Sequence, residues 1–194
     1  MSHFCLPLTT LPESIPHSSC SLFSILIPMS NFKLRAMLID DWAAVRQIYL
    51  EGIASGHATF ETNAPDYETW DANHHQFARL VLVTDERVAG WAALSRVSAR
   101  QVYAGVAEVS VYVSTEFRGH GHGQTLLNAL IEEAERNGIW TLQASIFPEN
   151  TGSIEIHSRG GFRVVGHRER IAKLKGVWRD TLLFERRSAV VGND

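Results

Sequence analysis

The sequence contains few cysteines, and both of them lie near its beginning. Cys5 and Cys20 are the two cysteines among 194 residues. Residues 31–188 therefore hold neither a disulfide nor a cysteine nucleophile. No run of Lys and Arg stands out and the formal net charge is −3, so a nucleic-acid partner is not indicated. No apolar stretch reaches the length of a membrane span, and we expect no membrane partner.

The first 30 residues differ in composition from the rest of the chain. They hold four of the six prolines, both cysteines, many serines and no Lys or Arg. A secretory signal needs positive charge before its apolar segment, and a transit peptide needs arginines, so this composition favours neither. We interpret residues 1–30 as a poorly structured extension, which an upstream start codon would explain, and we expect a cytoplasmic protein.

A regular succession of strand and helix patterns follows. The chain is 45% hydrophobic and 20% charged, which is ordinary for a compact folded domain. Patterns of period two and period 3.6 indicate about seven strands and about four helices over residues 31–188. Short turns join most strands, and one strand–helix–strand crossover interrupts them. The pattern predicts a single α+β domain around a twisted, mostly antiparallel sheet, with residues 189–194 as a tail.

Local signals set several of the expected boundaries. Asp40 is a candidate N-cap for a helix that begins near Trp42. A second helix is expected from about Tyr67 to Ala78, with the pair His74-His75 on its solvated side. Asn150 is a candidate N-cap for a short late helix.

The stretch 109–127 carries the strongest functional signal. A strand pattern of alternating apolar residues leads into Arg118-Gly-His-Gly-His-Gly123, and leucines then recur at helical spacing. The first N–H groups of a helix have no internal partner and lie at the positive end of its dipole. Glycines leave the approach to these groups open. We therefore expect a pyrophosphate site at this turn, with Arg118 as an added cation.

Other common sites do not fit this turn. A Rossmann fingerprint is excluded because the glycines fall at positions 119, 121 and 123. A Walker loop is excluded because no Gly-Lys-Ser/Thr follows. His120 and His122 would diverge in an extended turn and have no acidic neighbour, so no metal is expected there.

The pattern Arg118-Gly-x-Gly121-x-Gly123 after a Val-x-Val strand resembles the acyl-CoA loop of the GNAT N-acetyltransferases. Residues 150–162 are similar to a second family segment, the helix whose Asn contacts the pantetheine arm. The resemblance covers about 155 residues. It implies acetyl-CoA as co-substrate, no metal, and the GNAT fold. The cofactor-binding residues that it implies are Val111, Tyr112, Val113, Arg118, Gly119, His120, Gly121, His122, Gly123, Gln124, Asn150 and Ser153.

His157 stands where most GNAT proteins carry the Tyr that protonates the departing thiolate. One branch shares this His, namely the phosphinothricin acetyltransferases and related L-amino-acid N-acyltransferases. Its Glu-x-Ser-Val-Tyr-Val strand resembles Glu108-Val-Ser-Val-Tyr112-Val. The resemblance implies direct acetyl transfer to the α-amine of a small amino acid or analogue, such as phosphinothricin, methionine sulfoximine or methionine sulfone. Branch members commonly form homodimers, so a homodimer is expected.

The reaction needs a base for the amine and fixed donors for the thioester oxyanion. Glu108 and His157 are both candidates for the base, and His157 also for the acid, so their roles stay open at this point. Glu108 could instead be an exposed residue that an arginine neutralises. A free backbone N–H of Val111 or Tyr112 is the candidate oxyanion donor. Tyr112 is a further candidate catalytic residue, on the acceptor side.

The candidate substrate-binding residues are Phe60, Arg100 and Tyr103. An arginine suits the acceptor carboxylate, and Phe60 would pack on the acceptor's methylene groups. The branch often has a second basic residue where this chain has Ser98, which argues against tight binding of phosphinothricin. Two other functions stay open, a protein N-terminal or lysine acetyltransferase and a non-catalytic acyl-CoA-binding module.

Overall fold

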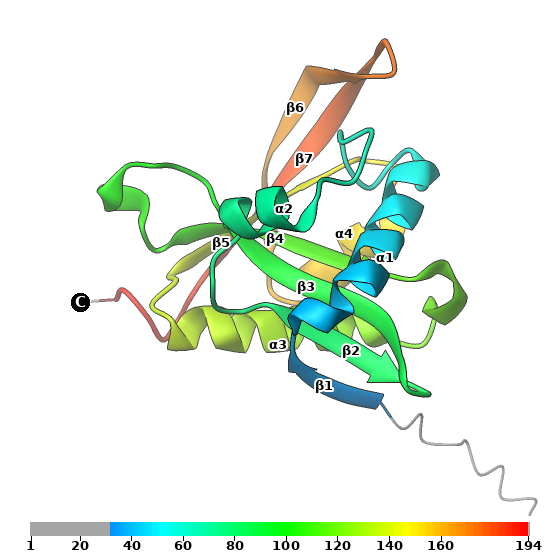
Figure 1. Ribbon diagram of the computed structural model, residues 1–194. Helices are drawn as coiled ribbons and strands as arrows, with labels where there is room; N and C mark the ends of the chain where they lie inside the picture. The colour runs from blue at the N-terminus through cyan, green and yellow to red at the C-terminus, as the bar shows by residue number, and fades with distance from the viewer. Residues whose placement is uncertain (1–31, 194) are drawn as a thin grey trace, which may run out of the picture.

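The computed structural model describes residues 32–193, which form one seven-stranded sheet and four α-helices (Figure 1). The predicted extension over residues 1–30 lies outside the described residues. The elements in chain order are β1 (Phe32–Ala36), α1 (Trp42–Ser55), α2 (Tyr67–Asn73), β2 (Leu80–Thr84), β3 (Arg87–Arg96), β4 (Val106–Val113), α3 (His122–Arg136), β5 (Thr141–Ile146), α4 (Thr151–Arg159), β6 (Arg163–Leu174) and β7 (Val177–Arg187).

The strands lie in the order β1-β2-β3-β4-β5-β7-β6. All neighbouring pairs are antiparallel except β4 and β5, which run parallel because α3 crosses over between them. The expected α+β domain with a mostly antiparallel sheet is therefore confirmed. No helix within residues 32–193 is long and apolar enough to cross a membrane.

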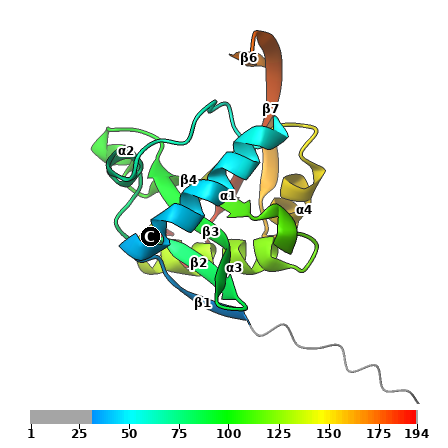
Figure 2. The ribbon, with the colours of Figure 1, turned by 45° about the vertical axis from the view of Figure 1, so that its right-hand side comes forward.

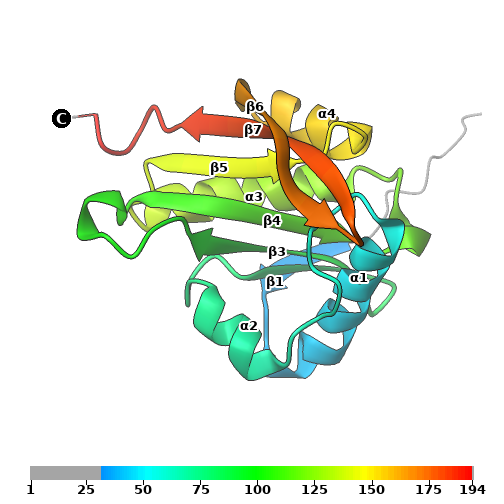
Figure 3. The ribbon, with the colours of Figure 1, turned by 90° about the horizontal axis from the view of Figure 1, so that it is seen from above.

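Helices cover both faces of the sheet. Figure 3 shows α1 and α2 on one face and α3 and α4 on the other. The larger core lies under α3 and α4, and a smaller core containing Trp70 and Trp91 lies under α1 and α2. The hairpin of β6 and β7 extends beyond the helices (Figure 2).

The period-two pattern of β4 divides its side chains between these two cores. Val109, Val111 and Val113 pack with the core under α3, and Tyr112 packs with the core under α1. This alternation is the one that the sequence predicts. Each side chain of β4 is therefore assigned to a face, which matters for the site described below.

The expected cap at Asp40 is wrong. A short 3-10 turn over Ile39–Asp41 precedes α1, and Asp41 is the N-cap residue without a side-chain cap. Its carboxylate instead accepts from the backbone N–H of Leu38 at 2.8 Å and pairs with Arg35 at 2.6 Å. The N-cap position thus falls one residue later than expected, and the carboxylate found there pairs with Arg35 in place of capping the helix.

The expected end of the second helix at Ala78 is also wrong, since α2 ends at Asn73. The backbone N–H of His75 donates to the carbonyl of Leu94 at 2.8 Å, and His74 bridges to Ser95 of β3. His75 is buried and His74 stacks on Trp70 at 4.3 Å, so neither is the solvated residue that was predicted. Pairing with β3 therefore overrides helical propensity at this point.

Candidate active site

A cleft opens in the sheet where β4 and β5 diverge. The two strands pair only from Val106 to Glu108 on β4, although β4 continues to Val113 and β5 to Ile146. The cleft has a volume of about 790 Å³. It is lined by the second half of β4, the glycine turn, the end of β5 and α4.

The antiparallel ladder identifies which backbone groups of β4 face this cleft. The N–H of Ser114, just after β4, donates to the carbonyl of Ala89 on β3 at 2.9 Å. Ser114 and Ala89 are therefore a hydrogen-bonded pair of the ladder. Such pairs alternate along the ladder, which places the N–H of Tyr112 on the β3 side. The N–H groups of Val111 and Val113 point the other way, into the gap left by β5. Of the two candidate oxyanion donors, Val111 therefore has the suitable direction.

The glycine turn presents backbone N–H groups at the mouth of the cleft. Gly119 and Gly121 have φ values of 82° and 80°, which favour glycine. The first helical bond of α3 runs from Thr125 N–H to the carbonyl of Gly121 at 3.1 Å. The N–H groups of the first turn that precede it therefore have no helical partner. With Arg118 beside them in the lining, they fit a diphosphate.

The two histidines of the turn do not diverge as expected. Their rings stack with centroids 5.9 Å apart. His122 is buried and its ring contacts Phe32, and burial lowers its pKa, whereas His120 is exposed and does not line the cleft. No group of three or more His, Cys, Asp or Glu within residues 32–193 has an arrangement that would hold a metal ion.

The start of α4 positions His157 and Asn150 at the cleft. The side-chain oxygen of Asn150 accepts from Ser153 N–H at 3.2 Å, which is the predicted cap, and its amide donates to the carbonyl of His57 at 3.1 Å. His157 is 4% exposed, and its Nδ1 lies 2.8 Å from the carbonyl of Ser153. A carbonyl only accepts, so Nδ1 carries the proton and Nε2 has a lone pair. This Nε2 is buried and has no hydrogen-bond partner among the described residues.

Burial lowers the pKa of His157, so the ring is neutral at neutral pH. Its ring packs against Phe162, with centroids 5.0 Å apart, in the core under α3 and α4. A neutral imidazole with its proton on Nδ1 can accept a proton at Nε2 but has none to donate there. In the free enzyme His157 can therefore act as a base at Nε2 but not as an acid there.

Glu108 and Tyr112 lie on the opposite face of β4 from His157. Glu108 lines the cleft and forms no ion pair within residues 32–193, so the alternative of an arginine-neutralised residue is not supported. Tyr112 stacks on Trp91 with ring centroids 4.8 Å apart and contacts Tyr49. Burial raises the pKa of Tyr112 far above its usual range, so its hydroxyl stays protonated.

The three candidate substrate-binding residues do not lie together. Phe60 lines the cleft and packs edge-on against Phe147 with centroids 4.7 Å apart. Arg100 and Tyr103 are exposed in the segment that precedes β4, with the Arg100 guanidinium over the Tyr103 ring at 5.6 Å. Neither lines the cleft in this chain. Their assignment to the acceptor stays a prediction without support from their position.

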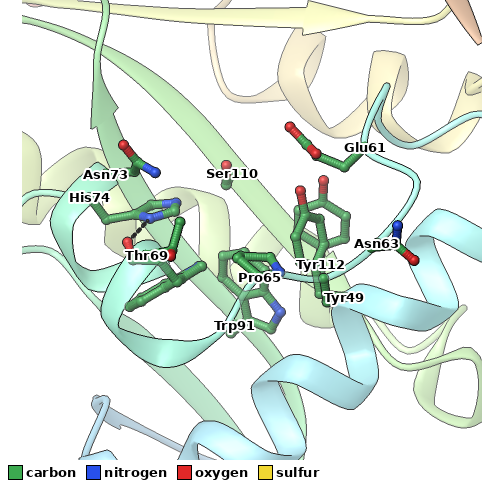
Figure 4. Close-up of a pocket in the computed structure, with 12 residues that line it drawn as sticks. Tyr49, Glu61, Asn63, Pro65, Thr69, Asn73, His74, Trp91, Ser110 and Tyr112 are labelled. Atoms are coloured by element: carbon green, nitrogen blue, oxygen red, sulfur yellow. Dashed lines mark hydrogen bonds between the residues drawn. The ribbon is translucent and has the colours of Figure 1, made fainter.

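A second cavity adjoins the cleft and was not predicted from the sequence. It has a volume of about 480 Å³, and its lining combines aromatic side chains with polar ones (Figure 4). Tyr49, Glu61, Ser110 and Tyr112 line both spaces, so the cavity and the cleft share a border. Strand alternation could have placed Ser110 and Tyr112 on this face. The pairing of Trp91 with Tyr112 depends on strand register, which the sequence alone did not provide.

Comparison with known proteins gives the family. Residues 42–162 match the Acetyltransferase (GNAT) family. The protein belongs to the GNAT family. It is 30% identical to an L-methionine sulfoximine/L-methionine sulfone acetyltransferase of Pseudomonas paraeruginosa, over 76% of this chain and 89% of that protein.

Solved structures of GNAT proteins show the same fold. A GNAT phosphinothricin acetyltransferase from Sinorhizobium meliloti, in complex with AcCoA, has a TM-score of 0.73 and 28% identity over 80% of this chain and 88% of that chain. A ribosomal-protein-alanine N-acetyltransferase from Brucella melitensis has a TM-score of 0.74 and 28% identity over 80% of this chain and 99% of that chain. This GNAT protein is thus an N-acetyltransferase.

Proposed function

We propose that this GNAT enzyme transfers the acetyl group of acetyl-CoA to the α-amine of a small amino acid or amino-acid analogue of the methionine sulfone, methionine sulfoximine or phosphinothricin type. The named activities of the two relatives above support this substrate class. The observation that carries the proposal is one cleft that holds a phosphate-binding turn at its mouth and Glu108 and His157 on opposite faces of the sheet.

We assign the donor to the mouth and length of the cleft. The N–H groups of His122, Gly123 and Gln124 would bind the diphosphate, with Arg118 adding positive charge. Bound acetyl-CoA supplies the activated acetyl thioester. When the amine attacks the carbonyl carbon of the thioester, the N–H of Val111 would donate to the carbonyl oxygen and stabilise the oxyanion that forms there. None of these roles needs a metal.

Glu108 would remove the proton from the ammonium form of the acceptor, because its side chain lies on the face that borders the second cavity. His157 lies on the donor face with a free lone pair on Nε2, so we assign it a place beside the departing sulfur. There it would accept the second proton, which the nitrogen loses after it has bonded to the carbonyl carbon, and pass it to the thiolate as the carbon–sulfur bond breaks. Tyr112 would shape the acceptor side and not transfer a proton, because its hydroxyl stays protonated.

The loops over the cleft favour a small acceptor over a protein chain. The segment after α1 and the segment after β5 are joined by the Asn150–His57 hydrogen bond and the Phe60–Phe147 contact. Arg179 adds a hydrogen bond to the carbonyl of Gly56 at 3.2 Å. The likeness to the ribosomal-protein-alanine N-acetyltransferase keeps protein N-terminal acetylation as the second candidate.

A thiol-release assay tests the proposal directly. Acetyl-CoA is offered with methionine sulfone, methionine sulfoximine, phosphinothricin, the standard amino acids, and peptides with free N-termini. We expect turnover with the free amino-acid analogues and little with peptides. Faster turnover of peptides would replace the proposal by the second candidate. Binding of acetyl-CoA without turnover of any amine would indicate a non-catalytic module.

We also propose a homodimer. Ile171, Val177 and Trp178 of the β6–β7 hairpin are each at least half exposed, which is unusual for large apolar side chains gathered on one hairpin. Light scattering coupled to gel filtration would give the mass of a dimer, and Trp178→Glu would give that of a monomer. A monomeric mass for the wild-type chain would overturn this assignment.

A further inference from the structure

Four aromatic side chains line the cavity beside the cleft, namely Tyr49, Trp70, Trp91 and Tyr112. Three of these rings are in contact with one another. Tyr112 stacks on Trp91, and its ring centroid lies 5.0 Å from that of Tyr49. Trp70 lies edge-on to Trp91 with centroids 5.9 Å apart and completes the wall. Figure 4 shows the hydroxyl groups of Tyr49 and Tyr112 side by side, directed toward the side on which Glu61 lies.

The charge of this cavity has one sign. Glu61 is the one acidic side chain that lines it among the described residues, and no Lys or Arg of that part of the chain does so. His74, which also lines it, has its pKa lowered by burial and is neutral. Arg79 lies over the Trp70 ring at 5.1 Å, but it is already paired with Asp71. The remaining polar groups are neutral, namely those of Asn63, Thr69, Asn73 and Ser110.

The position of the cavity relative to Glu108 indicates which part of an acceptor enters it. Glu108, Ser110 and Tyr112 lie on one face of β4, and Ser110 and Tyr112 border both the cleft and the cavity. If the α-amine lay beside Glu108, the substituents of its carbon would lie at this shared border. The α-amine would then stay in the cleft, and the side chain could extend into the cavity.

We propose that this cavity is the side-chain pocket of the acceptor and that it selects neutral polar side chains against anionic ones. The proposal rests on the function proposed above. An anionic side chain such as a phosphinate would lie beside Glu61 and against the negative faces of aromatic rings, without a cation to offset it. The oxygens of a sulfone or sulfoximine carry no net charge and can accept from the neighbouring hydroxyl and amide groups.

Kinetics with two acceptors test this selection. We expect kcat/KM for methionine sulfone to exceed that for phosphinothricin by about tenfold or more. Glu61→Gln should reduce this ratio at least about threefold, mainly through the KM of phosphinothricin. Asn73→Lys places a cation in the wall and should reduce it further. Glu68→Gln, an exposed carboxylate of α2 that does not line the cavity, is the matched control and should leave the ratio unchanged.

A binding measurement separates this inference from the proposed function. Trp70 and Trp91 line the cavity, so their fluorescence in the presence of coenzyme A reports occupancy by either amine. Tighter binding of methionine sulfone without any acetyl transfer would refute the proposed function and retain the selection. Equal or tighter binding of phosphinothricin, or a ratio unchanged by both Glu61→Gln and Asn73→Lys, would refute the selection while acetyl transfer stands.

Discussion

Glu108 and His157 line the same cleft from opposite faces of the sheet. Glu108 shares its face with Tyr112 and the aromatic cavity, whereas His157 packs on Phe162 beneath α4. The gap between β4 and β5 leaves the sheet open between the two faces. In the proposed mechanism each residue acts on a different reactant, so their substitutions should affect different steps.

Glu108→Gln should lower kcat/KM for the amine by about 100-fold, because the variant loses the general base and a positioned base contributes at least about this factor. The affinity for acetyl-CoA, measured by calorimetry, should stay unchanged. Glu132→Gln is the control, since Glu132 is exposed on α3 and pairs with Arg136. A loss of acetyl-CoA affinity in Glu108→Gln, or an unchanged rate, would contradict the role assigned to Glu108.

Burial of His157 makes folding stability depend on pH. Its pKa is lowered in the folded state, so between the folded value and the ordinary value of about 6.5 the unfolded chain binds more protons. Stability is therefore lost as the pH falls below about 6.5. Between pH 7.5 and pH 5 the free energy of unfolding should fall by roughly 1 kcal/mol less in His157→Gln than in the wild-type chain.

Urea unfolding at the two pH values measures this difference. His74, His75 and His122 also have lowered pKa values, so the variant should reduce the pH dependence and not abolish it. His120→Gln replaces an exposed histidine and serves as the control. If His157→Gln and His120→Gln have equal pH dependence, the buried neutral ring is not the cause.

Gly121 allows a comparison between backbone strain and blocked access. Gly121→Ala adds a methyl group at φ 80°, which costs roughly 1–2 kcal/mol, and this methyl meets no protein atom within 4 Å. It therefore occupies space at the cleft mouth, and the KM for acetyl-CoA should rise about tenfold.

Gly176→Ala supplies the matched variant, because Gly176 has φ 83° and open space around it in the β6–β7 turn. Both variants should lose similar stability in thermal unfolding. Only Gly121→Ala should raise the KM for acetyl-CoA. A similar rise in both would indicate a general loss of folding and would count against the phosphate site.

Tyr112 should act through its ring and not through its hydroxyl proton. Since its hydroxyl stays protonated, Tyr112→Phe should leave the alkaline side of the rate profile unchanged up to about pH 10. Tyr112→Ala removes the ring that stacks on Trp91 and should cost about 3–5 kcal/mol of stability. A new alkaline limb in Tyr112→Phe would show that the hydroxyl does take part in proton transfer.

Local patterns predicted the parts of the site that are continuous in sequence. The glycine turn, the alternation of β4 and the cap at Asn150 all follow from spacing and backbone requirements. The aromatic cavity could not be predicted, because Tyr49, Trp91 and Tyr112 come from three elements joined only by packing. The end of α2 was missed for the same reason, since its pairing with β3 is a tertiary contact.

The expected placement of Arg100 in the acceptor pocket illustrates the same limit. The resemblance matched a position along the chain, but the direction of the loop before β4 depends on its packing. Arg100 lies over Tyr103 at the surface and lines neither space. Spacing thus predicted that the glycine turn lies at the cleft, whereas it did not predict the position of Arg100.

β4 and β5 separate after Glu108, which divides the sheet into two parts. One part contains β1, β2, β3 and β4, and the other contains β5, β7 and β6. Among the described residues, β4 and β5 connect the two parts through three residue pairs. A ligand bound between β4 and β5 would contact both parts of the sheet and hold them together. Amide hydrogen exchange at Val111 and Val113 should then slow on ligand binding, and the melting temperature should rise with ligand concentration. The opening to which we assign the donor is thus also where neighbouring strands share the fewest residue pairs within residues 32–193, and occupancy would oppose unfolding there.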